Sequence, residues 1–418
     1  MAIDLITLGK HLKKAREDRG VTQEAAAETL GIPRTAVVQM EAGNRSISTL
    51  ELAQLADFYV RPIAEFFSEG PLKEAPEDDP ILALYRVTNS FKGHPDVQHQ
   101  VGRCVEICRE GADLEHLLGK KARSGPPFYS LPEPRNAMEA VHQGSRVAAE
   151  ERSRLGLGDA PIHALADLLS NQGVWAASVD LPAGMSGLFL RDSSIGMVIL
   201  VNQDHARPRK RFSYAHEYAH ALLDRNRTAI VSTRENSKDR SETRANAFAA
   251  SLLMPEGGVR SYLGSLDKGL PSRQTQLVYD LADDGGVEAS GRSVPGSQTI
   301  GYQDVASLAR YFGVSYQAAT FRLQALSVVN QSERESLIEQ EELGNRYLRM
   351  LSFRQAIDSP KADEHHEDAQ NKELVSQVAY LAIEAFRREE ISKGKLLELS
   401  KKLEISGKEL LALAQGAL

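Results

Sequence analysis

Two histidines four residues apart, with a glutamate directly after the first, stand in the stretch RFSYAHEYAHALL at residues 211–223. On an α-helix, His216 and His220 differ by about one turn and project from the same face, so both imidazoles can bind one metal ion. Glu217 lies roughly a third of a turn round, too far to share the ion, but its carboxylate can reach a water held there. This spacing predicts that two histidines bind zinc and that the glutamate takes a proton from the water.

A catalytic zinc ion takes three protein ligands and keeps one open position. The best candidate for the third ligand lies in SETRANAFAASLLMP, where apolar residues recur at helical spacing from Ala245 until Pro255. Glu242 precedes this stripe by three residues and so lies at the N-terminal end of the inward face. A carboxylate there is costly unless something pairs it, as a zinc ion would. Asn246, one turn after Glu242, can hydrogen-bond to one of the metal ligands without binding the metal itself.

The pentapeptide HExxH also occurs by chance, in helices that merely carry two histidines. Two independent features argue against chance here: the helix follows a predicted β-hairpin, and an unpaired inward glutamate follows on a second helix. The identity of the group that stabilises the oxyanion is left open, since His205, Tyr214 and Tyr302 are candidates by residue type only.

The elements around this motif predict an α+β arrangement. A strand is expected at 174–179, and two apolar runs around RDSSIG, within 185–202, predict the hairpin. The segments 224–241 and 282–301, rich in charge or in Gly and Ser, are expected to be loops that are disordered or gate the substrate. A second helix-turn-helix pattern at 301–330 is expected to buttress the catalytic core, and binding of substrate or nucleic acid is the alternative.

Residues 5–67 predict short helices packed close together. Thr22 is the expected N-cap of one helix, which ends at Gly31, and Pro33 suits the first turn of the next. Two helices joined by a short turn that contains glycine form a helix-turn-helix.

This N-terminal stretch resembles the Cro/repressor (XRE) type of DNA-binding domain. The resemblance implies one set of residues that faces the major groove and another that reaches phosphates. The first set is Arg34, Thr35 and Gln39, and the second is Gln23, Asn44 and Arg45. Residues 1–70 hold eight Lys and Arg against ten Asp and Glu, which is unusually acidic for a DNA reader. A helical bundle for dimerisation or protein docking is therefore the alternative.

The strings RKRFSYAHEYAHALL and ETRANAFAASLLMP resemble the ImmA/IrrE family of zinc metallopeptidases, and the similarity extends over about residues 140–330. The resemblance implies that His216 and His220 are the histidine ligands, Glu217 the catalytic glutamate and Glu242 the third ligand. Family members cut a partner repressor, usually a small helix-turn-helix protein, and many carry an XRE-type domain at the N-terminus. Asp224 stands where members often have another histidine that is not a ligand.

The chain has 418 residues, a net charge of −7 and only two cysteines, so it predicts a multidomain, cytoplasmic protein without a disulfide scaffold. Cys104 and Cys108 are expected on a buried helix face rather than in a metal or redox site. The pair His365 and His366 is expected in a solvated linker. No apolar run is long enough to span a bilayer.

The predicted fold is mainly α, with an α+β zincin-like metallopeptidase domain and all-α N-terminal and C-terminal regions. The expected domains are a helix-turn-helix at 1–70, a helical linker region at 71–139, the metallopeptidase domain at 140–330 including the segment 301–330, and a helical C-terminal region at 331–418.

The predicted function is a DNA-binding, Zn2+-dependent endopeptidase that cleaves a partner transcriptional repressor site-specifically and so induces genes of a mobile element, a defence island or a stress regulon. The expected partners are that small repressor and double-stranded DNA, a homodimer is left open, and no membrane is involved. The rival is a non-proteolytic regulator or antitoxin that uses the zinc domain for sensing or docking. Glu217 favours catalysis, because a purely structural site has no need of it.

Overall fold

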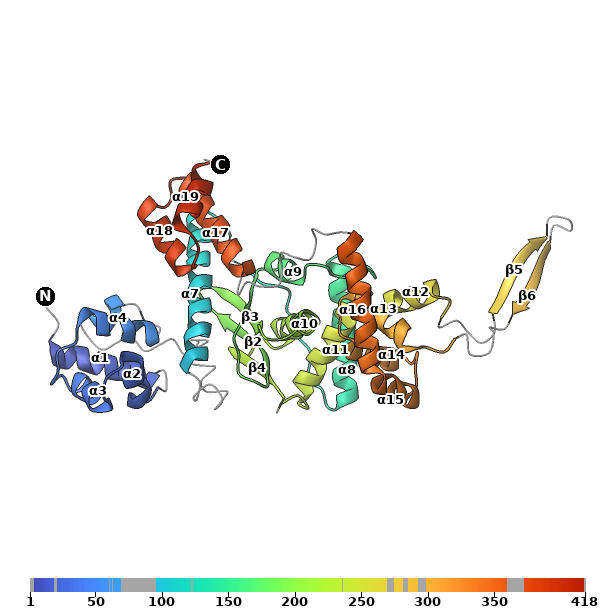
Figure 1. Cartoon of the computed structure of the whole chain (residues 1–418), viewed down its shortest axis with the longest axis horizontal. Coiled ribbons are helices and arrows are strands. Elements are labelled where there is room, and N and C mark those ends of the chain that lie inside the picture. The colour runs from blue at the N-terminus through green and yellow to red at the C-terminus, as the bar shows by residue number, and fades with distance from the viewer. Residues whose placement is uncertain are drawn as a thin grey trace.

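The computed structural model describes residues 4–18, 21–59, 61, 63–68, 95–121, 123–234, 236–268, 274–280, 285–291, 298–358 and 372–416. The protein is mostly helical and holds one small mixed sheet (Figure 1), which confirms the predicted fold class. No helix within these ranges is both long enough and apolar enough to cross a membrane.

The N-terminal helices share a hydrophobic core of their own. They are α1 (Leu5–Asp18), α2 (Gln23–Leu30), α3 (Arg34–Glu41), α4 (Thr49–Phe58) and α5 (Ile63–Phe66). The Thr22 hydroxyl accepts a hydrogen bond from the backbone N–H of Ala25 at 3.2 Å, and Gly31 ends α2 in the left-handed conformation at φ 64°. Both ends of α2 are therefore where the capping residues predict.

The sheet contains β1 (Val174–Val179), β2 (Met185–Asp192), β3 (Gly196–Asn202) and β4 (Ala229–Thr233), in the spatial order β1-β3-β2-β4. β1 runs parallel to β3, whereas β2 is antiparallel to both β3 and β4. The predicted strand and hairpin are confirmed. Because side chains alternate along each strand, the sheet has two apolar faces, and each is covered by helices.

One face of the sheet packs against a helical layer that contains the candidate site. The layer comprises α8 (Ala137–Arg154), α9 (Leu165–Asn171), α10 (Arg207–Leu223), α11 (Arg240–Leu253) and α12 (Glu256–Ser265). Its core continues into α13 (Tyr302–Phe312), α14 (Tyr316–Ala325), α15 (Gln331–Glu339) and α16 (Glu341–Asp358). The second helix-turn-helix pattern thus lies in the same core as α10, which agrees with the expected buttress.

The opposite face packs against α7 (Pro95–Leu117), α17 (Lys372–Arg387), α18 (Lys393–Lys402) and α19 (Gly407–Gln415). These helices group together in Figure 1 although α7 and α17 are far apart in the sequence. Trp175 of β1 is fully buried in this second core, with the Arg123 guanidinium 3.5 Å from its ring. Cys104 and Cys108 are buried there and form no disulfide, as their apolar helix face predicts.

Two segments expected to be loops contain strands. β4 lies inside 224–241. Its short run AIVST forms a strand because it is apolar and β-branched, although its neighbours are charged, and because it pairs with β2. β6 (Gly285–Gly291) lies inside 282–301 and pairs antiparallel with β5 (Gln274–Asp280). Figure 1 shows this hairpin projecting from the rest of the molecule. Residues 71–94 of the expected helical linker region and the pair His365 and His366 lie outside the described residues.

Candidate metal centre

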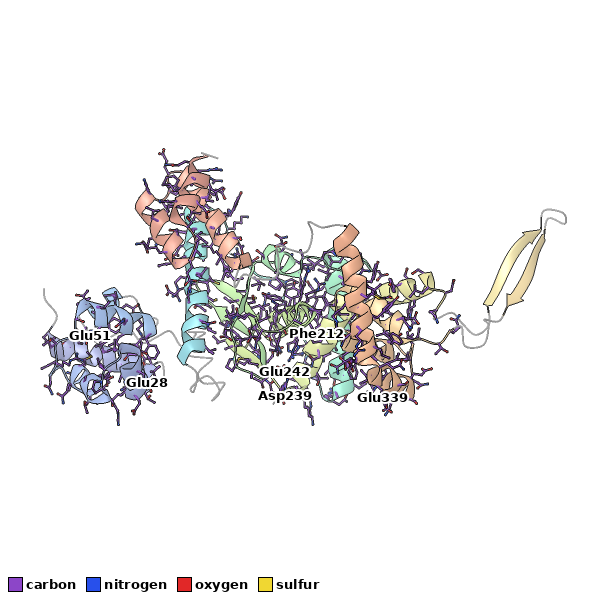
Figure 2. The ribbon with its side chains drawn as sticks, viewed as in Figure 1. Glu28, Glu51, Phe212, Asp239, Glu242 and Glu339 are labelled. Atoms are coloured by element: carbon purple, nitrogen blue, oxygen red, sulfur yellow. The ribbon has the colours of Figure 1, made fainter. Side chains whose placement is uncertain are left out.

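The motif helix α10 lies against the sheet and places its two histidines and its glutamate in the protein interior. His216 is 6% exposed, and Glu217 and His220 are fully buried. The helix packs beside α11, whose first turn carries Glu242, 3% exposed. Figure 2 labels Glu242 of α11 and Phe212 of α10 in this central part of the protein.

Three side chains converge between α10 and α11. The His216 Nε2 atom lies 3.0 Å from Glu242 Oε2, and His220 Nε2 lies 3.5 Å from Glu242 Oε1. The two Nε2 atoms are 3.3 Å apart. Within the described ranges, these residues form the single cluster of three or more potential metal ligands, with ligand atoms all within 4.8 Å of one another.

The far side of each imidazole is also held. His216 Nδ1 lies 2.9 Å from the side-chain oxygen of Asn246, and His220 Nδ1 lies 2.8 Å from Asp224 Oδ2. Arg244 donates to the other oxygen of Asp224 at 2.6 Å. If Nδ1 of each ring donates in these contacts, its Nε2 lone pair is directed toward Glu242, the arrangement typical of histidines that bind a metal.

This donor set fits a zinc ion. Two imidazole nitrogens that face each other beside a carboxylate repel one another unless a proton or a cation lies between them. Burial disfavours the charged form of His220, but hydrogen bonds to Asp224 and Glu242 outweigh it and raise its pKa to about 10. Burial raises the pKa of Glu242, yet its contacts with both histidines prevail and lower it to about 2. The pocket therefore favours positive charge, and two histidines with one carboxylate suit catalytic zinc.

Glu217 lies beside these groups with both carboxylate oxygens buried and without a hydrogen-bond partner. Burial is the main cause that raises its pKa above the ordinary value, against the nearby histidines and the Ser232 hydroxyl of β4, which favour the charged form. Ser232 lies close to the carboxylate without a hydrogen bond of regular geometry. A carboxylate that is fully buried and has no hydrogen-bond partner indicates a functional group rather than a structural one.

Gly187 of β2 makes room for that carboxylate. A Cβ atom at this position would lie 2.7 Å from Glu217 Oε1 and 3.1 Å from the backbone oxygen of Leu200. The first distance is shorter than a non-bonded contact allows, so any larger side chain would displace Glu217 or the strand. The roles of Gly187, Asp224 and Arg244 were not predicted from the sequence; the i, i+4 spacing of His220 and Asp224 is the one signal that it offers.

The three oxyanion candidates lie in different surroundings. Tyr214 is buried in the core of the helical layer. The Tyr302 ring lies edge-on to that of Tyr347 of α16, with the ring centroids 6.4 Å apart. His205, just before α10, is half-buried, and its Nδ1 atom has no hydrogen-bond partner. Burial and nearby Arg209 lower the pKa of His205, which keeps the ring neutral near pH 7.

The predicted DNA-contacting residues lie in and around α2 and α3. Arg34, Thr35, Gln39 and Asn44 are exposed. Gln23 is half-buried and hydrogen-bonds to Glu41 at 3.0 Å. Arg45 is paired with Glu51, labelled in Figure 2, at 2.8 Å. The exposed residues of α3 are therefore accessible to a DNA groove, although Arg34 also donates a hydrogen bond to Gln23 at 3.4 Å, and Gln23 and Arg45 have further partners within the domain.

Comparison with known families agrees with this geometry. Residues 170–270 match the IrrE N-terminal-like domain of peptidase family M78, and residues 12–66 match a helix-turn-helix family. No curated protein matches the chain. The chain thus carries an IrrE/ImmA-like peptidase-family domain and an N-terminal XRE-type helix-turn-helix domain, which confirms both resemblances. The first match includes the HExxH motif and Glu242, and the second supports DNA binding by the N-terminal helices.

Proposed function

We propose that this protein is a zinc-dependent endopeptidase that cleaves a partner transcriptional repressor at a specific site and thereby induces gene expression. The observation that carries the proposal is the buried, unpaired carboxylate of Glu217 beside three converging ligand side chains. A structural zinc site would use the three ligands but would gain nothing from an unpaired buried carboxylate, which costs stability.

In this proposal His216, His220 and Glu242 hold the zinc ion, and Asn246 and Asp224 orient the two imidazoles. When bound, zinc supplies a Lewis acid that polarises a peptide carbonyl and makes water a better nucleophile. Glu217 accepts the proton of the attacking water and delivers it to the leaving nitrogen. The carboxylate accepts no hydrogen bond of regular geometry from the residues around it, so it is available for that proton.

The edge strand β4 supports peptide binding beside Glu217. In the part of the chain that the structure describes, β4 pairs with β2 alone, and Ser232 of β4 lies near the Glu217 carboxylate. A free strand edge can take up an extended peptide through backbone hydrogen bonds. An unfolded or loop segment of a repressor is the kind of substrate that fits this edge.

The helix-turn-helix domain supports the choice of a repressor as substrate. A protease bound to the same DNA as its substrate meets it at a raised effective concentration, without any new contact. We expect this reaction in the cytoplasm, where the DNA is. A general degradative protease would gain no such advantage from a DNA-binding domain.

The test is to incubate the zinc-loaded protein with the small repressor-type protein encoded beside it, with and without DNA, and to read intact masses over time. A Glu217→Gln variant runs in parallel. We expect discrete fragments from the wild type and none from the variant. A stable complex with an uncut partner in every condition, despite bound zinc, would instead support a non-proteolytic regulator or antitoxin.

A further inference from the structure

A large cleft lies at the N-terminal end of α10. Its volume is about 1310 Å³. Its walls come from residues 161–163 before α9, from the start of α10, from the α13–α14 turn and from α16. None of the three candidate zinc ligands lines it. The proposed peptidase reaction therefore leaves this cleft without a role.

The charged side chains of the cleft are of one sign. Five arginines line it and no aspartate or glutamate does; they are Arg207, Arg209, Arg211, Arg310 and Arg349. The chain as a whole carries a net charge of −7, so this concentration of positive charge is local. Arg207, Arg209 and Arg349 are exposed, and no described carboxylate forms an ion pair with them. Like charges crowded in one concavity raise the local potential and attract anions.

One of the five arginines builds the cleft instead of facing a ligand. Arg211 donates hydrogen bonds to the backbone oxygens of Gly313 at 3.0 Å and His163 at 2.9 Å, and also to that of Ile162. It thereby ties α10 to two of the other walls. Burial, with a contribution from Arg207, lowers the pKa of Arg211 to about 10. The cleft is thus formed in advance and lacks a compensating anion.

The start of α10 adds to the same potential. Ala206 is the N-cap of the helix and provides no side-chain hydrogen bond, and the first turn holds no acidic residue but contains Arg207 and Arg209. Cations are unfavourable at this end, because the helix dipole already places partial positive charge there. A phosphate group bound beside these arginines would reverse that penalty.

Aromatic rings stand beside the charges. Tyr262 and Tyr311 both line the cleft and stack on one another, with ring centroids 4.6 Å apart and planes at 28°. Tyr311 remains 45% exposed, so part of its ring is open to a flat partner. Arginines that can bind phosphate, next to an exposed aromatic ring that can stack on a base, match the two ends of a nucleotide.

We propose that this cleft binds a nucleotide, with its phosphates on Arg207, Arg209 and Arg349 and its base against Tyr311. The inference goes beyond the proposed peptidase function and does not depend on it. Because α10 carries both the cleft and His216 and His220, the bound nucleotide would contact the first turn of the metal-binding helix.

Calorimetric titration of the full-length protein with ADP tests the proposal. We expect saturable binding of one ADP per chain. Arg207→Gln and Arg349→Gln should each weaken it at least about tenfold, since each removes a charge-assisted contact to phosphate. Arg346→Gln is the matched control, because Arg346 lies on the same helix, pairs with Glu342 at 2.7 Å and does not line the cleft. It should leave the affinity unchanged.

Further arms identify the ligand class and the location. Tyr311→Ala should weaken ADP more than pyrophosphate, and removal of metal with a chelator should leave ADP affinity unchanged. The proposal is overturned if the folded wild type shows no saturable ADP binding, or if Arg346→Gln and Arg349→Gln lose equal affinity. It is also overturned if ADP binding disappears when the chelator removes the metal, or if a single-stranded oligonucleotide binds far more tightly than ADP. Thermal unfolding of each variant verifies that it is folded.

Discussion

At the scale of single residues, the candidate centre depends on contacts that fix each ligand from behind. Asn246 holds His216, and Asp224 holds His220 while Arg244 holds Asp224. Such contacts set the orientation of the imidazoles before a metal ion arrives, and their loss typically costs about 10- to 100-fold in metal affinity or activity. Glu217 is the exception, since its position is set by space rather than by hydrogen bonds.

Replacing Gly187 by alanine is therefore expected to impair catalysis more than metal binding. The added Cβ would lie 2.7 Å from Glu217 Oε1, so the carboxylate must move away from the place where it meets water. A misplaced general base loses up to its whole contribution, about 10²- to 10⁴-fold in rate. Repressor cleavage should fall by at least about tenfold, whereas zinc content should stay that of the wild type.

Gly264→Ala is the control for this prediction, because a Cβ atom there meets nothing within 4 Å. It should leave the cleavage rate as it is. Full activity in Gly187→Ala would mean that Glu217 is free to relocate, and the role assigned to the glycine would be wrong.

The four central residues could be proposed from the sequence. His216, Glu217 and His220 lie on one helix, whose periodicity alone fixes their relative positions, so the rest of the fold was not needed. Glu242 was recognisable as a carboxylate on an apolar stripe. The role of Gly187 could not be predicted, since it depends on a strand–helix contact with Glu217, thirty residues away in the chain.

At the scale of elements, the position of Glu242 depends on how closely α11 approaches α8. Gly144 of α8 makes this possible, because a Cβ atom there would lie 2.2 Å from the backbone oxygen of Arg244. Gly144→Ala should separate the helices and lower the free energy of unfolding by about 1–3 kcal/mol, the usual cost of overpacking. Urea unfolding and zinc retention measure both effects.

Met138→Ala on the same helix serves as the comparison, because Met138 is 77% exposed. It should change the unfolding free energy by less than about 0.5 kcal/mol. An equal and small effect of the two substitutions would show that α8 and α11 adapt without strain.

The contact between α7 and α18 should depend on pH. Glu110 of α7 pairs with Lys402 and, at 3.2 Å, with Lys395 of α18. Burial raises the pKa of Glu110, but the two lysines outweigh it and bring the pKa below the ordinary 4.5. A lowered folded-state pKa stabilises the protein above pH 4.5, and this stabilisation is lost as the pH falls through the folded value.

Glu110→Gln should therefore cost about 0.5–1 kcal/mol of unfolding free energy near pH 7, a modest value because both lysines are partly exposed. The difference from the wild type should shrink below pH 4.5 and at high salt. Urea titrations across this range measure it. A difference that is the same at every pH would assign the effect to packing and not to charge.

Elements with strong local patterns could be predicted, and weak ones could not. The hairpin of β2 and β3 has two apolar runs with a turn between them, and α2 has both of its caps. β4 has five residues among charged neighbours, and pairing with β2 gives it its structure. Local sequence carries no information about such a partner.

At the scale of the whole molecule, α7 and the C-terminal helices act as one cover for the second face of the sheet. Deletion of residues 372–418 would expose buried side chains of that face, among them Trp175, Leu188 and Val198. We expect the truncated protein to aggregate or lose its fold, as judged by soluble yield and circular dichroism.

Deletion of residues 1–70 is the matched comparison, because the N-terminal helices have a separate hydrophobic core. That variant should keep its remaining helices and its zinc. A soluble, zinc-binding protein without residues 372–418 would contradict the role of the C-terminal helices as a cover. The sequence identified these helices as amphipathic, but the surface that they cover is decided by contacts between residues far apart in the chain, such as that of Arg103 with Glu404, 301 residues later.

The zinc content of the purified protein shows whether His216, His220 and Glu242 form a zinc centre. Elemental analysis of the purified protein should give one zinc ion per chain in the wild type and in Glu217→Gln. Glu242→Gln should retain far less after dialysis, because it loses an anionic ligand. A wild type that takes up no zinc, or a Glu242→Gln variant that holds it as tightly as the wild type, would contradict the account.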